Sequence, residues 1–191
     1  MNHIVAKPHK NPRNRRAINH FAHDETGATA VEFSLVAIPF MFMLIGLIEM
    51  GLMFAAGAVL HGGTADAGRL VRTGQIQAAA DPEAAFEQAL CDHVSALMAC
   101  ADITYEVVNL GEEGFQGASA VAPVINDDGD MQPRPFDAGE QNTVTLIRAS
   151  YRYPIKTPIF APLLSDTPDN KKLFMSTIVI RNEPYAFDEG L

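Results

Sequence analysis

Glu32 lies four residues after Ala28 and five after Gly27. This spacing would allow its carboxylate to form an ion pair with an amine at Ala28. A proteolytic cut between Gly27 and Ala28 would expose an α-amino group at Ala28. Helical residues four apart lie on one face, so the Glu32 carboxylate could pair with that amine, within one chain or from the next subunit. An amine at the edge of a hydrocarbon layer needs such an anionic partner. As a plain helix-start residue, Glu32 would instead gain about 0.3–1 kcal/mol from the helix dipole.

The order of segments around Gly27 differs from that of a secretory signal. Three arginines precede it (Arg13, Arg15 and Arg16), and an uncharged apolar run follows it, from Phe33 to Ile48. In a secretory signal the cleavage site comes after the apolar core, whereas Gly27 comes before it. A cut after Gly27 would therefore leave the apolar segment attached to the mature chain.

The string Gly27-Ala-Thr-Ala-Val-Glu32-Phe33 resembles the prepilin peptidase site of type IV pilin-like proteins, with Glu32 as the fifth residue of the mature chain. Residues 24–74, which include Gly46-Leu-Ile-Glu49-Met-Gly51, are similar to TadE-like pseudopilins of the tight-adherence (Flp) pilus system. This resemblance implies a processing site at Gly27, Ala28, Glu32 and Phe33, with intersubunit pairing of Glu32 during assembly. The implied partners are a prepilin peptidase, other pilins and pseudopilins, and an inner-membrane assembly platform.

The function that the resemblance implies is that of a pseudopilin or minor pilin, which assists or primes assembly of an adhesive fibre. The alternative from another class is a signal-anchored extracytoplasmic binding or sensing module, whose helix is only a tether. An anchored enzyme is the third, but no phosphate-binding glycine loop, zinc spacing or nucleophile elbow occurs, so we predict neither catalysis nor a cofactor. A tether needs neither Gly27 nor Glu32, whereas a pilin needs both.

The apolar run is long enough to cross a bilayer. Residues 33–48 would form a helix of about 24 Å, and 33–60 one of about 42 Å, against a hydrocarbon core of roughly 30 Å. We assign 28–60 as the transmembrane helix; the alternative is a buried helix of a soluble protein. The basic flank places the N-terminus in the cytoplasm and the following domain in the periplasm of a single-pass inner-membrane protein. Incorporation into a surface pilus is left open.

Two residues inside this run call for an explanation. Pro39 lacks a backbone N–H, so we expect a kink or a short unwound stretch near it. Glu49 lies about 25 Å along a helix from Glu32, which would place it near the outer interface. It would then contact headgroups or water, or pair with a cation of a neighbouring subunit or of the platform.

The charge distribution separates the leader from the rest of the chain. Residues 1–27 hold five Lys/Arg and two acids, a net charge of +3, so the formal charge of −9 leaves −12 for the remainder. So acidic a product is not expected to bind nucleic acid. Residues 1–27 form a polar cytoplasmic leader that would be removed on maturation. Its histidines are poorly spaced for a metal site, and none is predicted; they are His3, His9, His20 and His23.

Small residues dominate the stem that we assign to 61–80 and the end of the segment before it. Such a surface allows helices to pack closely, although Gly62-Gly63 could equally be a flexible hinge. Gly74 is the expected helix end, with Arg69 and Arg72 in the last turn, where cations are favoured.

A head domain is predicted over residues 81–191, beginning with a helix. Asp81-Pro82-Glu83 combines an N-cap, a proline at the first position and an acid in the first turn. Apolar residues then recur at helical spacing, in the order Phe86, Leu90, Val94 and Leu97.

Cys91 and Cys100 pose a geometric problem within this region. An unbroken helix would separate them by about 13.5 Å, too far for a disulfide. Either the chain turns back near Met98 and they pair, which export favours, or they stay unpaired.

Three alternating segments predict strands, and two long loops join them. The segments are Ile103–Leu110, Thr143–Tyr153 and Leu173–Ile180. One face of such a sheet needs a covering helix, which the helix from Pro82 or the upper stem could supply. The predicted fold is α+β, a long N-terminal helix followed by a small antiparallel sheet of about three strands.

The loop between the first two strands contains an acidic turn, Asn126-Asp127-Asp128-Gly129-Asp130. Its oxygens could hold Ca²⁺, but the downstream bidentate glutamate of an EF-hand loop is missing. A solvated acidic turn is the preferred interpretation, and whether Asp127, Asp128 and Asp130 bind calcium stays open.

Overall fold

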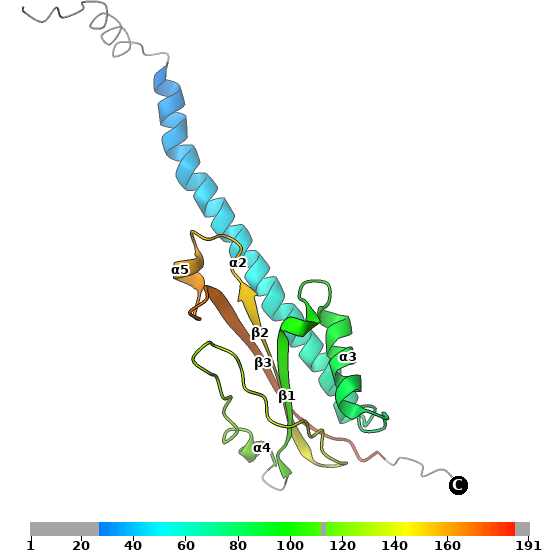
Figure 1. Ribbon diagram of the computed structural model, residues 1–191. Coiled ribbons are helices and arrows are strands. Elements are labelled where there is room, and N and C mark those ends of the chain that lie inside the picture. Colours follow the sequence, from blue (N-terminus) through cyan, green and yellow to red (C-terminus); the bar gives the residue numbers. More distant parts are fainter. Residues whose placement is uncertain (1–26, 112–113, 186–191) are drawn as a thin grey trace, which may run out of the picture. The chain divides into compact units, whose positions relative to one another are not determined.

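The computed structural model describes residues 27–111 and 114–185, which form parts of two compact units, 1–44 and 45–191 (Figure 1). In the first unit, the described residues are the beginning of the long helix α2 (Ala28–Arg72). The predicted leader, with its four histidines, lies outside the described residues except for Gly27.

Helix α2 ends where the sequence indicates. Arg69 and Arg72 lie in its last turn, and Gly74 adopts a positive φ of 78°. The Gly74 N–H donates to the Val71 carbonyl at 3.1 Å, which satisfies one of the helix-end acceptors. Pro39 lies inside α2 and the helix continues on both sides of it, so of the kink or short unwound stretch that we expected, the unwound stretch does not occur and the kink stays a prediction.

Helix α3 spans Pro82–Val94 and begins at the predicted N-cap. The Asp81 carboxylate accepts a hydrogen bond from the Ala84 N–H at 3.1 Å. Phe86, Leu90 and Val94 are buried, as their spacing predicts. Leu97 is 52% exposed, so its place in the apolar stripe was wrong. The helix ends at Val94 and the chain turns, which breaks the periodicity and buries Met98 instead.

Three strands form one antiparallel sheet in the order β1-β2-β3. They are β1 (Ile103–Asn109), β2 (Val144–Pro154) and β3 (Lys171–Arg181). The connections contain the short helical elements η2 (Cys100–Asp102), α4 (Gly114–Gly117) and α5 (Ala161–Leu164). The predicted α+β class, with a long N-terminal helix and a three-stranded antiparallel sheet, is confirmed.

Both helices cover one face of the sheet (Figure 1). The C-terminal half of α2 and the apolar stripe of α3 share a core with side chains of β1 and β2. The core includes Ala67 and Val71 of α2, Phe86 and Leu90 of α3, Val107 of β1, and Ile147 and Ala149 of β2. A smaller cluster around Leu110, Val144 and Leu146 also contains Ala118 and Val121 from the long β1–β2 connection. The central strand β2 is therefore almost entirely buried.

Candidate functional site

Helix α2 begins at Ala28, directly after the predicted cut at Gly27. Gly27, Ala28, Glu32 and Phe33 are all exposed. Within the described part of the chain, Glu32 has no hydrogen-bond or ion-pair partner, whereas the nearby Ser34 hydroxyl donates to the Val31 carbonyl at 2.9 Å. The Glu32 carboxylate is thus accessible to a partner from outside the chain.

In the described part of the first unit, residues 27–44, most exposed side chains are apolar. They include Val31, Phe33, Leu35, Val36, Ile38, Phe40, Met41 and Met43. An 18-residue window of α2 has a mean hydropathy of 2.3 and no residue buried within the protein. Among the helices of residues 27–111 and 114–185, only α2 is long and apolar enough to span a membrane, and it is compatible with a single-pass anchor.

Glu49 is buried, with 2% of its surface exposed, and residues at the end of β2 and in the loop after it supply its partners. Oε1 accepts from the Lys156 backbone N–H at 2.9 Å and from the Tyr153 hydroxyl at 3.3 Å. Oε2 accepts from the backbone N–H of Thr157 at 3.0 Å and from its hydroxyl at 2.7 Å. The two roles that we considered, contact with headgroups and pairing with a cation of another protein, both need an exposed carboxylate, which this arrangement does not offer.

One turn of α2 therefore carries two contacts to the segment after β2. Besides the bonds at Glu49, the Phe160 ring packs on Gly46, with its Cζ 3.1 Å from the position that a Cβ would take. Any side chain at Gly46 would displace this ring. Residues 153–160 are thus fastened to α2 between Gly46 and Glu49.

The glycines further along α2 allow close packing rather than bending. A Cβ at Gly63 would lie 2.8 Å from Val94 Cγ1, and one at Gly68 would clash with Ile178 of β3. Gly62 lies under the His93 ring, whose Nδ1 is 2.9 Å from Asp66 Oδ2. Gly62 and Gly63 lie within continuous helix, so of the two interpretations left open, close packing is the one that the structure has.

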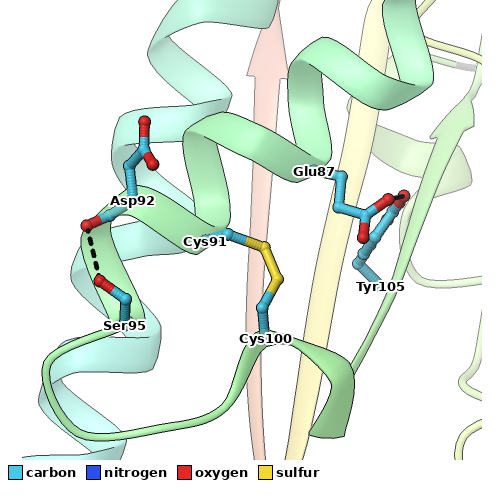
Figure 2. Close-up of a disulfide and its surroundings, with 6 residues drawn as sticks. All are labelled: Glu87, Cys91, Asp92, Ser95, Cys100 and Tyr105. Atoms are coloured by element: carbon cyan, nitrogen blue, oxygen red, sulfur yellow. Dashed lines mark hydrogen bonds between the residues drawn. A yellow bond between two sulfur atoms is a disulfide. The ribbon is translucent and has the colours of Figure 1, made fainter.

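Cys91 and Cys100 form a disulfide between α3 and η2 (Figure 2). The turn after Val94 brings their Cα atoms to 5.3 Å, within the usual range. Glu87 lies beside the pair and its Oε2 accepts a hydrogen bond of 3.4 Å from the Tyr105 hydroxyl. Both sulfurs are consumed by the disulfide, so this group offers no thiolate to a metal.

The acidic turn is closed by its own hydrogen bonds and by an arginine. Asn126 Oδ1 accepts from the Asp130 N–H at 2.7 Å. Arg152 of β2 pairs with the Asp130 carboxylate at 2.9 Å and donates to the Asp128 carbonyl at 2.9 Å. These contacts neutralise part of the charge that a cation would need.

The sequence did not predict one buried group of ion pairs, which is centred on Glu106. Glu106 of β1 is paired in register with Arg148 of β2, and their side chains form an ion pair. Arg134 of the long connection also binds Glu106, at 3.0 Å. An acid in an alternating strand indicates an exposed face, but here the β1–β2 connection covers that face. Only the placement of Arg134 and Arg148, far along the chain, could have indicated it.

Comparison with known proteins places one segment of this chain. The family model described as "TadE-like protein" matches residues 27–69. No curated protein and no solved structure matches the chain. The matched segment starts at Gly27 and includes Glu32, Pro39 and Glu49. Residues 27–69 are therefore TadE-like, which confirms the resemblance predicted from the sequence.

Proposed function

We propose that this protein is a prepilin that a prepilin peptidase cuts after Gly27, and that its product acts as a pseudopilin or minor pilin in assembly of a tight-adherence pilus. A TadE-like segment suggests a protein associated with that pilus system. The observation that carries the proposal is the family match itself, which begins at Gly27 and covers Glu32 and the exposed apolar part of α2.

The exposed Glu32 supports an assembly role. After the cut, the α-amino group of Ala28 would stand at the positive end of the α2 dipole, where a cation is disfavoured. A carboxylate from the same or an adjacent subunit would offset this cost, and Glu32 has no competing partner among the described residues. Pairing between subunits would align one α2 against the next in the membrane.

The membrane segment in this proposal comprises residues 28–48. A helix of that length measures about 31 Å, close to the hydrocarbon core. The expected span of 28–60 includes Glu49, Ala56 and Leu60, which the structure buries against the head domain. A shorter span leaves these contacts intact, with the N-terminus cytoplasmic and the head on the periplasmic side.

The experiment replaces Glu32 with Ala in a strain that makes tight-adherence pili. We expect cleavage and membrane insertion to persist, since neither the Gly27-Ala28 bond nor the apolar run changes, while piliation and adhesion fall. Glu32→Asp, which keeps the charge, should retain part of the piliation, and Ser34→Ala serves as the control on the same exposed helix. Normal pili in the Glu32→Ala strain would remove the assembly role and favour a tethered binding module.

A further inference from the structure

The loop between β2 and β3 presents large apolar side chains to solvent. Ile159 is 64% exposed and Leu163 is 79% exposed, and Pro158 and Pro162 beside them are exposed as well. Scattered single hydrophobic residues are ordinary on a protein surface. Here four exposed apolar residues lie within a stretch of six, so their exposure is not scattered.

The loop that carries these exposed residues is attached to the rest of the unit by buried side chains and hydrogen bonds. Phe160 and Ala161, between the exposed residues, are buried. The Phe160 ring packs on Gly46, and Thr157 is bound to Glu49 through two hydrogen bonds. The exposure of Ile159 and Leu163 is therefore fixed by the fold.

The attachment point on α2 is where the uncharged stretch 33–48 ends, although exposed apolar residues continue to Phe54. Leu47 and Ile48 are exposed on the same turn, and Glu49 is the first charged residue after Glu32. If residues 28–48 span the bilayer, this turn leaves the hydrocarbon core. Figure 1 shows α5 beyond the end of β2, beside α2. Leu47, Ile48 and the apolar patch thus lie in the same compact unit, 45–191, at the turn of α2 that the Phe160 ring contacts.

We infer that Pro158–Leu164 is a second membrane contact, in which Ile159 and Leu163 enter the interface of the leaflet on the head's side. This inference rests on the membrane anchor of the proposed function. The apolar face of an interfacial amphipathic helix lies about 5–10 Å deep, at the boundary between headgroups and acyl chains, and we expect these two side chains to reach the same boundary. Lys156 is exposed and forms no ion pair with any described residue, so its charge is available to anionic headgroups. The contact would fix the head against the membrane before assembly.

The test uses the full chain in nanodiscs of phosphatidylethanolamine and phosphatidylglycerol, with its disulfide intact. Leu163→Cys and, separately, Ile159→Cys carry an environment-sensitive fluorophore. Leu97→Cys is the matched control, because Leu97 is also an exposed leucine of the head but lies after α3. Phe40→Cys, in the proposed span, is the control for lipid exposure.

We expect the labels at residues 159 and 163 to show blue-shifted emission, quenching by nitroxide-bearing lipids and protection from aqueous iodide. The label at residue 40 should behave in the same way, whereas the label at residue 97 should behave as in water. Iodide quenching at 159 and 163 equal to that at 97, with residue 40 still in lipid, would overturn the membrane contact and leave the anchor standing. Protection that appears only at several subunits per disc would assign the patch to a second copy instead. A residue 40 label in water would overturn the anchor and the contact together.

Discussion

Thr157 donates two hydrogen bonds to a single oxygen of Glu49, one from its backbone N–H at 3.0 Å and one from its hydroxyl at 2.7 Å. These residues lie 108 positions apart in the sequence. The contact ties the loop after β2 to the turn of α2 where the apolar run ends. The sequence alone suggests that the Glu49 carboxylate would be costly to place in a bilayer. In the structure this carboxylate instead accepts hydrogen bonds from the loop after β2.

Replacing Glu49 with Ala should destabilise the head domain. The change leaves the part-buried N–H groups of Lys156 and Thr157 without their acceptor. Because water can reach these donors in part, we expect a total loss of about 1–3 kcal/mol rather than that cost for each bond. Thr157→Val removes only the hydroxyl bond and should cost less, on the order of 1 kcal/mol. Thermal unfolding of the full chain in detergent measures both. Glu32→Ala is the matched control, since Glu32 is exposed. Equal melting temperatures for Glu49→Ala and this control would contradict a stabilising role of the Glu49 hydrogen bonds.

Glycine substitutions along α2 should separate packed from open positions. Gly68→Ala places a methyl group against Ile178, and overpacking of this kind costs about 1–3 kcal/mol. Gly51→Ala is the control, because nothing lies within 4 Å of its Cβ position, and alanine there should gain roughly 0.5–1 kcal/mol of helix stability. Denaturant unfolding compares the two. A Gly68→Ala protein as stable as Gly51→Ala would show that α2 does not pack on β3 as closely as described.

Alkaline unfolding should depend on Tyr105. Burial, with the negative charges of Glu87 and Glu83, raises the pKa of Tyr105 from 10.0 to about 12. An unfolded tyrosine loses its proton near 10, so the folded state binds this proton more tightly. The resulting stability is fully present below pH 10 and is lost as the pH rises from about 10 towards 12. Tyr105→Phe should therefore show a shallower decline in unfolding free energy across that window. Parallel curves for the two proteins would refute the assignment.

Tyr153 of β2 provides an independent check of the Glu49 contact. Burial, followed by the Glu49 charge, raises the pKa of Tyr153 to about 12 as well. In Glu49→Ala this second influence disappears, so phenolate absorbance of Tyr153 should develop at lower pH than in the parent. Tyr105 is the internal comparison, because the described structure places no contact between it and Glu49.

The helices and strands could be predicted from patterns among neighbouring residues. The predictions that failed concern residues whose surroundings depend on contacts with distant parts of the chain. Asp81-Pro82 marked the start of α3, and alternation located all three strands, because these patterns depend on neighbouring residues. Leu97 was misplaced because a periodic pattern does not reveal where the chain turns. Glu49 and Glu106 were not understood, since their partners lie far along the chain and reach them only after the sheet has formed.

For the predicted processing site, the sequence is more informative than the structure. Gly27, Ala28 and Glu32 were recognised from their order relative to the apolar run, and the family match now covers them. Their chemistry depends on a peptidase and on neighbouring subunits, which a single chain does not contain. The structure adds only that α2 starts at Ala28 and that Glu32 is exposed.

The most direct test of the prepilin assignment is the intact mass of the protein after co-expression with its cognate prepilin peptidase. The account predicts a product that begins at Ala28 and keeps the whole of α2, together with an uncut chain when Gly27 is replaced by Leu. A parent protein that retains residues 1–27 in the presence of active peptidase would contradict the account.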